Sequence, residues 1–219
     1  MNLDKIFIIN LPERTDRKIQ IIDELKKQNI TNYDFFDGVR PTLEDVDKWN
    51  KNYCFHNKKN VHPFKFLNYR RGCLGCLKSH IEIIKIALER NYKNILILED
   101  DTEFIDNFDK LFEYAKEINN TYDMLYLAGS HLGTKKYVSN NVNKVIGTHT
   151  TGSYCITEKA MKYILNNIEG YDKEIDVFYA KILQPIFNCY CVKMHITRQR
   201  DGYSDIQQGN VSYGYNWNM

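Results

Sequence analysis

The chain has no long apolar run and little net charge, and these two absences narrow its class. Its 219 residues carry 30 Lys and Arg against 28 Asp and Glu, which gives a formal net charge of +2 at pH 7. A charge this small gives no reason to expect a nucleic acid or an anionic membrane as the main partner. No stretch reaches the roughly 18 apolar residues of a membrane span, and residues 1–5 lead into a short strand without the apolar region of a signal peptide. We therefore expect a soluble, cytoplasmic protein.

The six cysteines are spaced irregularly, which is not the pattern of a disulfide framework in a reducing compartment. Cys73 and Cys76 form a single CxxC pair. A structural zinc site would need two more ligands, which Cys189 and Cys191 could supply only if the fold brought them together. No redox-type context surrounds the pair, so buried thiols are the favoured interpretation.

Strands that alternate with helices predict an α/β protein with a mostly parallel central sheet. We expect strands at residues 5–10, 33–36, 95–98, 123–127, 153–157 and 188–193, with a small hairpin centred on residues 140–141. We expect helices at residues 16–29, from Thr42 onward, and at 77–88, 108–118, 158–166 and 177–183. Residues 51–71 show no periodicity and predict a long loop, and the remainder after residue 193 reads as irregular.

Three consecutive acids, Glu99, Asp100 and Asp101, directly follow the apolar run at residues 95–98. That run is typical of a central parallel strand buried on both faces, and open α/β sheets bind ligands just beyond the carboxyl ends of such strands. Adjacent acids repel one another unless a cation shares the site. The triplet therefore indicates a site for Mg²⁺ or Mn²⁺ with a phosphorylated ligand. The alternative is a solvated acidic turn after a core strand.

Two other places carry residues suited to anions. Arg14 and Arg17 follow the first strand at the start of a helix, where they can meet a diphosphate or a nucleotide, although solvated helix-start residues are the commoner case. Gly72, Gly75, Ser79 and His80 are expected to open the long helix, where glycines permit close backbone approach and the helix start favours anions. A lone histidine such as His80 is more often a packing residue than a catalyst.

Taken together, several ordered motifs resemble glycosyltransferase family 25, which includes lipooligosaccharide galactosyltransferases and collagen galactosyltransferases. The motifs are residues 8–11 with Arg14, Asp16 and Arg17, then residues 75–80, 98–101, 123–129, 151–156, 175–176 and 202–206. No single motif is specific, but their order and spacing extend over nearly the whole chain.

The resemblance implies a GT-A fold, a Rossmann-like α/β domain that would span residues 1–219. Residues 1 to about 130 would form the nucleotide-sugar half, and residues 131–219 the acceptor half with a C-terminal closing segment. The donor would be a UDP-hexose, with galactose and glucose both open, and the cofactor Mn²⁺ or Mg²⁺. The resemblance places Glu99 and Asp101 at the metal. It places at the donor Asn10, Leu11, Arg14, Arg17, Ser79, Asp100, Gly129 and Asp205.

Members of the family typically invert the anomeric centre, which requires a carboxylate to take the proton of the acceptor hydroxyl. The resemblance points to Asp176 as this catalytic base, with Asp172 and Glu174 as substitutes. The alternative role for Asp176 is a helix N-cap, since Asp is favoured there. Lys78 and the missing proline before Asp176 depart from the family pattern and leave the acceptor open.

The sequence thus predicts a metal-dependent, inverting glycosyltransferase that moves a hexose from UDP to a hydroxyl of a glycan or a protein. One alternative is a non-catalytic carbohydrate- or partner-binding domain with the same fold. Another is a Mg²⁺-dependent phosphohydrolase, which is disfavoured because aspartyl-phosphate enzymes usually place their paired Asp on an early strand, whereas this triplet begins with Glu99 near mid-chain.

Overall fold

The structure is a computed structural model that describes residues 1–49 and 63–213, with side chains from residue 66 onward in the second range. The strands are β1 (Lys5–Asn10), β2 (Tyr33–Asp37), β3 (Asn94–Glu99), β4 (Thr102–Phe104), β5 (Met124–Tyr126), β6 (Ser130–Tyr137), β7 (Val142–His149), β8 (Ser153–Thr157), β9 (Cys189–Val192), β10 (Thr197–Gln199), β11 (Gly202–Ser204) and β12 (Gly209–Val211). The helices are α1 (Thr15–Lys27), α2 (Leu43–Trp49), α3 (Pro63–Glu89), α4 (Lys110–Glu117), α5 (Glu158–Asn167), α6 (Ile175–Phe178) and the π-helical η3 (Tyr179–Leu183).

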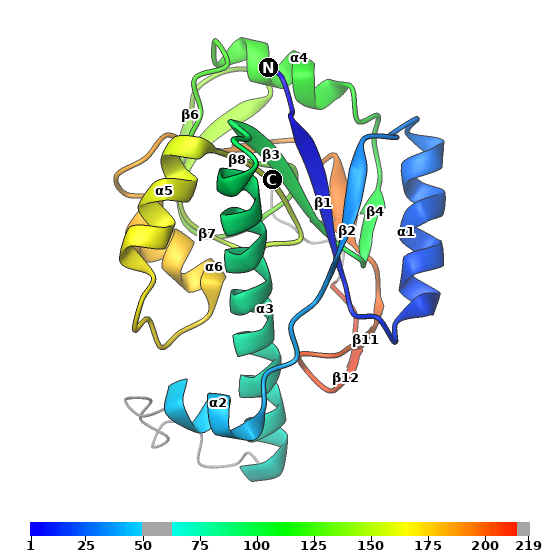
Figure 1. Ribbon diagram of the computed structural model, residues 1–219. Helices are drawn as coiled ribbons and strands as arrows, with labels where there is room; N and C mark the ends of the chain where they lie inside the picture. The colour runs from blue at the N-terminus through cyan, green and yellow to red at the C-terminus, as the bar shows by residue number, and fades with distance from the viewer. Residues whose placement is uncertain (50–62, 214–219) are drawn as a thin grey trace.

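The central sheet has the order β2-β1-β3-β8-β5-β9-β7-β6. From β2 to β9 all strands run in one direction except β8, which is antiparallel to both β3 and β5. The β6–β7 hairpin completes the sheet through antiparallel pairing of β7 with β9. The predicted α/β architecture with a mostly parallel sheet flanked by helices is therefore confirmed (Figure 1).

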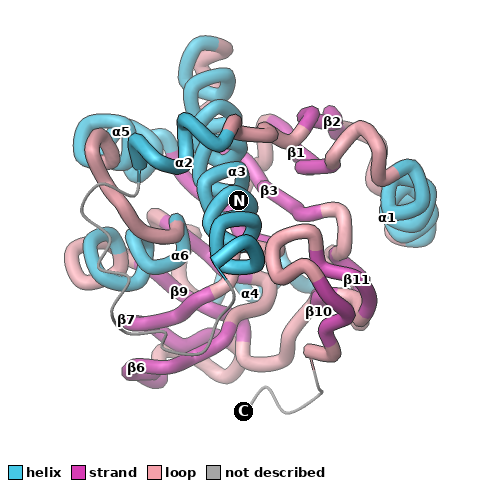
Figure 2. Tube along the Cα trace, turned by 90° about the horizontal axis from the view of Figure 1, so that it is seen from below, coloured by secondary structure: helices cyan, strands magenta, loops and turns pink. Residues whose placement is uncertain are grey.

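Two hydrophobic cores cover the two faces of this sheet, because successive residues of a buried strand point to opposite faces. Ile95 and Ile97 of β3 pack in one core with α3, α5 and α6, and Leu96 and Leu98 pack in the other with α1 and α4. Figure 2 accordingly shows β1, β2 and β3 lying between α3 and α1. The strand that carries the acids at its carboxyl end is thus fixed from both sides.

The prediction of a loop up to residue 71 is wrong for residues 63–71, which form the first turns of α3; residues 50–62 lie outside the described residues. Pro63 is suited to the first position of a helix. The apolar period is hidden in this stretch because one inward position is charged: Arg70 is fully buried between Phe66 and Leu74 in the inward row of the helix. Its guanidinium stacks 3.8 Å from the Trp49 ring centre and bonds to Glu174 at 3.0 Å.

Other elements differ from the sequence prediction in extent. The hairpin around residues 140–141 is longer than expected, since β6 and β7 have eight residues each. The segment after residue 193 contains three short strands, of which β10 pairs with β4 and β11 with β12. Among the residues that the structure describes, no helix is both long enough and apolar enough to cross a membrane.

Candidate active site

A cavity of ≈ 240 Å³ opens where β1, β2 and β3 end. Leu11 and Gly38 line it just beyond β1 and β2, and the acid triplet lines it at the carboxyl end of β3. One side of α3, from Asn68 to His80, forms a second wall. The third wall comes from residues 199–213, which we call the closing segment. The cavity therefore joins parts of the chain that are nearly 200 residues apart.

Arg17 holds the acids at the centre of this cavity. Its NH1 lies 2.8 Å from Asp100 Oδ1 and 3.4 Å from Asp101 Oδ2. Asn10 donates from Nδ2 to Asp100 Oδ2 at 2.8 Å and to the Arg14 carbonyl at 3.1 Å. Asn10 is itself buried and is not part of the cavity lining, so within the protein it positions Asp100 and the turn that follows β1.

The carboxylate charge of Asp101 is only partly balanced by the groups around it. Its side chain is only 8% exposed, and its Oδ1 has no hydrogen-bond partner within the described part of the chain. Burial, followed by repulsion from Glu99, raises the pKa of the Asp101 carboxyl to about 7, against the effect of Arg17. Burial also raises the pKa of Asp100. Asp101 lines the cavity, and a buried carboxylate with an oxygen left unpaired by the described residues suits a hard divalent cation.

Glu99 is held by groups from two other elements. Thr151 donates its hydroxyl to Glu99 Oε1 at 2.7 Å, and His80 Nε2 lies 3.5 Å from the same oxygen. Although burial raises the pKa of Glu99, the contacts with His80 and Thr151 lower it, and the net direction is downward. His80 is fully buried, and its Nδ1 contacts the Tyr154 hydroxyl at 2.7 Å. Glu99 is therefore an oriented carboxylate.

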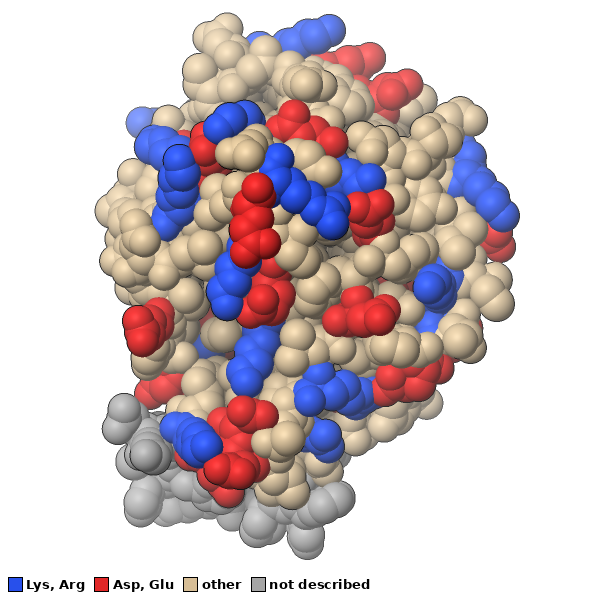
Figure 3. All heavy atoms as spheres, viewed as in Figure 1, with Lys and Arg blue, Asp and Glu red and all other residues tan. Residues whose placement is uncertain are grey.

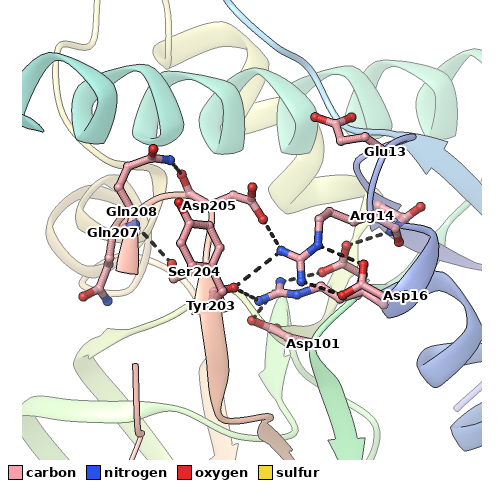
Figure 4. Close-up of polar contacts among 12 residues, drawn as sticks. Glu13, Arg14, Asp16, Asp101, Tyr203, Ser204, Asp205, Gln207 and Gln208 are labelled. Carbon is pink, nitrogen blue, oxygen red and sulfur yellow. Dashed lines mark hydrogen bonds and ion pairs between the residues drawn. The ribbon is translucent and has the colours of Figure 1, made fainter. Parts of the chain in front are cut away.

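The closing segment is attached to the loop that follows β1. Arg14 forms an ion pair with Asp205, and Figure 4 shows its guanidinium pointing between Asp205 and Asp16. The Tyr203 carbonyl accepts a hydrogen bond from Arg17 at 2.8 Å. The backbone N–H of Arg200 in turn donates to the Asp101 carbonyl at 2.7 Å. Arg14 thus faces the closing segment and does not line the cavity.

The expectation that Gly72, Gly75, Ser79 and His80 open the long helix is wrong, because α3 begins at Pro63 and these residues lie in its middle. The glycines instead permit close approach to other segments. A Cβ at Gly72 would stand 2.8 Å from the Ile206 Cα, and one at Gly75 would stand 2.6 Å from the Val39 carbonyl oxygen. Ser79 lines the cavity, but its hydroxyl accepts from the Val39 N–H and donates to the Gly75 carbonyl.

Asp176 is not among the residues that line the cavity. Its Oδ2 is 3.5 Å from His149 Nδ1 and 3.4 Å from the Thr150 N–H, while its Oδ1 accepts from the Val177 N–H at 2.7 Å. The N-cap interpretation is wrong, since Glu174 is the N-cap of α6. Thr150 has φ = 77°, an unusual conformation for a β-branched residue. This strained turn joins His149 to Thr151, whose hydroxyl donates to Glu99.

The structure thus brings together most of the residues singled out from the sequence, but not all. The ones that line the cavity are Leu11, Arg17, Ser79, Glu99, Asp100, Asp101 and Asp205. Gly129 lies elsewhere, packed against Thr148 and Cys191. Sequence reasoning assigned no individual role in the site to Thr151 or Gln199. Thr151 holds Glu99, and Gln199 lines the cavity. Each belongs to a segment whose position depends on long-range folding.

The surface seen in Figure 3 carries Lys and Arg interspersed with Asp and Glu, without a large patch of one sign. The cysteines in the described residues are free, and Cys73, Cys155, Cys189 and Cys191 are buried. Of the CxxC pair, Cys76 lies beside His80 and Glu99, whose ligand atoms fall within 4.8 Å of one another. Cys191 belongs to a different group of ligands, so the structure does not gather the two cysteine pairs into one zinc site.

Comparisons with known proteins place the chain in one family. A sequence profile described as "Glycosyltransferase family 25 (LPS biosynthesis protein)" matches residues 3–179. Procollagen galactosyltransferase 2 of Mus musculus is 28% identical over 190 residues, which cover 81% of this chain and 30% of that protein. The procollagen lysyl hydroxylase and glycosyltransferase of Acanthamoeba polyphaga mimivirus is 28% identical, over 75% of this chain and 20% of that protein.

A human relative, named inactive glycosyltransferase 25 family member 3, is 24% identical over 62% of this chain and 23% of its own length. The chain therefore spans less than a third of each of these three relatives. A solved structure of apo UDP-glucose pyrophosphorylase aligns over 86% of this chain and 89% of that chain with a TM-score of 0.47 and 9% identity. Because the family profile covers most of the sequence, this chain is a member of glycosyltransferase family 25.

Proposed function

We propose that this chain transfers a hexose, galactose or glucose, from a UDP-sugar to a hydroxyl of a glycan or protein acceptor, with inversion and with Mn²⁺ or Mg²⁺ as cofactor. Family membership supports sugar transfer, and the finer assignment comes from the cavity. Its main support is the acid triplet, in which one guanidinium pairs with Asp100 and Asp101 and, among the described residues, Asp101 Oδ1 has no hydrogen-bond partner. Hard oxygen ligands of this kind suit Mg²⁺ and Mn²⁺.

Each residue then has a defined task. Asp101 and Glu99 would hold the cation, while Asp100, fixed by Asn10 and Arg17, would contact the donor. When bound, the cation supplies positive charge for the departing diphosphate. Arg17 lines the cavity and can pair with a phosphate oxygen, since a guanidinium matches the geometry of phosphate.

Asp176 is the proposed base for the acceptor hydroxyl, and His149 is its immediate neighbour at 3.5 Å. In an inverting displacement the Asp176 carboxylate takes the proton from the acceptor O–H as that oxygen attacks the anomeric carbon. The segment from His149 to Thr151 joins this base to Glu99, because Thr151 donates to Glu99 and the Thr150 N–H faces Asp176. A single turn can therefore set the position of the base relative to the donor.

The test of the donor and the metal is thermal stability of the purified chain with UDP, UDP-galactose or UDP-glucose, each with Mn²⁺ and with EDTA. A ligand present at 100 times its Kd stabilises the folded state by about 2.7 kcal/mol. We expect a Mn²⁺-dependent rise in Tm for UDP and for one UDP-hexose in the wild type. Asp101→Asn should lose it, and Asp23→Asn, which changes an exposed acid of α1, should keep it. Equal shifts in Asp101→Asn and wild type would refute the metal assignment.

Asp176→Asn tests the base separately. We expect transfer to fall at least tenfold while the UDP-dependent rise in Tm is retained, since the change leaves the acid triplet intact. A loss of both would indicate a structural role for Asp176, and unchanged transfer would exclude it as the base.

A non-catalytic binding domain is the second candidate, because relatives in this family are named inactive. It predicts no release of UDP from any UDP-hexose with any acceptor, even where the sugar or nucleotide binds. Mn²⁺-dependent UDP release that Asp101→Asn abolishes would exclude this candidate.

A further inference from the structure

A second group of metal-ligating side chains lies outside the cavity, at the start of the β6–β7 hairpin. His131 is on β6, Cys191 is on β9, and His195 is in the segment between β9 and β10. One ring nitrogen of each histidine and the Cys191 sulfur lie within 4.8 Å of one another. Cys191 is buried, and the two rings meet edge to face with centres 6.3 Å apart. Three ligands from separate elements thus converge on one point.

The contacts around this group orient one of its members. His131 Nδ1 lies 2.7 Å from the Thr148 hydroxyl, which leaves Nε2 as the nitrogen that can coordinate. Histidines that bind metals almost always have their other nitrogen in such a hydrogen bond. Thr148 is buried, and its methyl group would stand 2.6 Å from a Cβ at Gly129. The glycine therefore lets Thr148 come close enough to hold the ring.

The protonation states of two ligands bear on how the ion would bind. Burial, and secondarily Lys135, lower the pKa of His131 to about 4, so this imidazole is neutral at pH 7 as a metal ligand must be. Burial raises the pKa of the Cys191 thiol well above its usual range, and the smaller opposite effect of Lys135 leaves it raised. The thiol therefore keeps its proton until a metal ion displaces it on binding.

We propose that His131, Cys191 and His195 form a site for a borderline-soft divalent metal ion, of which Zn²⁺ is the type, with a water molecule as the fourth ligand. Two imidazoles and one thiolate suit Zn²⁺ and not the hard cations of the acid triplet. In a tetrahedral zinc site the ligand atoms lie about 3.5 Å apart, given Zn–N and Zn–S distances of about 2.1 and 2.3 Å. Because the ligand atoms lie within 4.8 Å of one another, the side chains would have to approach by at most about 1.3 Å.

The ion would bind the segment after β9 to the hairpin. That segment leads into β10, and Gln199, the last residue of β10, lines the cavity. The same hairpin ends at His149, which faces Asp176. A metal ion at this point would therefore stabilise two parts of the chain near the site, β10 and the end of the hairpin, without contacting the acid triplet. The inference is independent of the proposed transfer reaction, since it concerns binding of the ion alone.

Titration of the metal-free, reduced protein with Co²⁺ tests the site, because a Co²⁺–thiolate bond gives a sulfur-to-cobalt charge-transfer band that carboxylates cannot give. Two cysteines could produce it in the described residues, since Cys76 also lies in a ligand group with His80 and Glu99. We expect the band in the wild type and in Cys76→Ser, and its loss in Cys191→Ser. Cys189→Ser is the matched control, because it places a hydroxyl at another buried position of β9, and it should keep the band.

Three further variants keep the test valid if Cys191→Ser does not fold. His195→Gln and His131→Gln should lower Co²⁺ and Zn²⁺ affinity at least tenfold, and Thr148→Val should lower it by about tenfold, with folding checked by circular dichroism. Absence of the band in the folded wild type would overturn the proposal. So would a band that is lost in Cys76→Ser, or one that survives in folded Cys191→Ser.

Discussion

Asp101→Asn should make the metal-free protein more stable, and the gain should grow with pH. The Asp101 carboxyl has its pKa raised from 3.8 to about 7, first by burial and then by Glu99. Below pH 4 both the folded and the unfolded chain keep this proton. Between about pH 4 and 7 the unfolded chain loses the proton and the folded chain retains it, so stability falls as pH rises. The asparagine removes this cost.

A pKa difference of about three units corresponds to about 4 kcal/mol above pH 8, as an upper limit. Between pH 5 and pH 8 the stability gap between Asp101→Asn and wild type should widen by about 2 to 3 kcal/mol. Urea denaturation in EDTA at the two pH values measures it. Asp16→Asn is the control: the Arg14 contact lowers the pKa of Asp16 to about 2, so its contribution is complete by pH 5. The difference in unfolding free energy between Asp16→Asn and wild type should therefore be the same at pH 5 and pH 8. A gap for Asp101→Asn that is equal or smaller at pH 8 would refute the reasoning.

Three further changes test the walls of the site and the packing behind it. Arg14→Ala removes the ion pair with the closing segment. It should raise the KM for the donor several-fold and speed proteolysis within residues 199–213. An unchanged rate of cleavage would contradict this prediction. Gly72→Ala would place a Cβ 2.8 Å from a backbone carbon of the closing segment and should cost about 1 to 3 kcal/mol in urea denaturation, whereas Gly209→Ala has open space and should cost less. Glu174→Ala takes the carboxylate from the buried Arg70 guanidinium and should cost about 3 kcal/mol or more; a loss below 1 kcal/mol would show that the other contacts of Arg70 suffice.

The strands could be predicted because burial on both faces leaves an unbroken apolar run, as at residues 95–98. The start of α3 could not be, since the inward position held by Arg70 carries a charge that interrupts the apolar period. The direction of β8 was also beyond sequence reasoning. An antiparallel strand buried between β3 and β5 has the same composition as a parallel one.

In the site, the convergence of Arg17 with the acids was predictable, because the ends of neighbouring parallel strands meet at one edge of a sheet. The groups that orient the acids were not. Thr151 reaches Glu99 only because β8 runs back beside β3, and Arg17 bonds to a backbone carbonyl that any residue at position 203 would supply. The roles assigned to Asp176, Gly129 and the donor-binding residues stay predictions.

The attachment of the closing segment to Arg14 and Arg17 has a consequence for synthesis on the ribosome. The partners are separated by 186 to 191 residues, a distance that takes about 10 to 40 s to translate at typical rates. The first strands, β1, β2 and β3, are synthesised with Arg17 and the acids in the first half of that time, whereas β9 of the same sheet and the third wall of the cavity follow only at its end. Completion of the sheet and enclosure of a ligand would therefore both be late folding steps, because they depend on neighbouring parts of the chain.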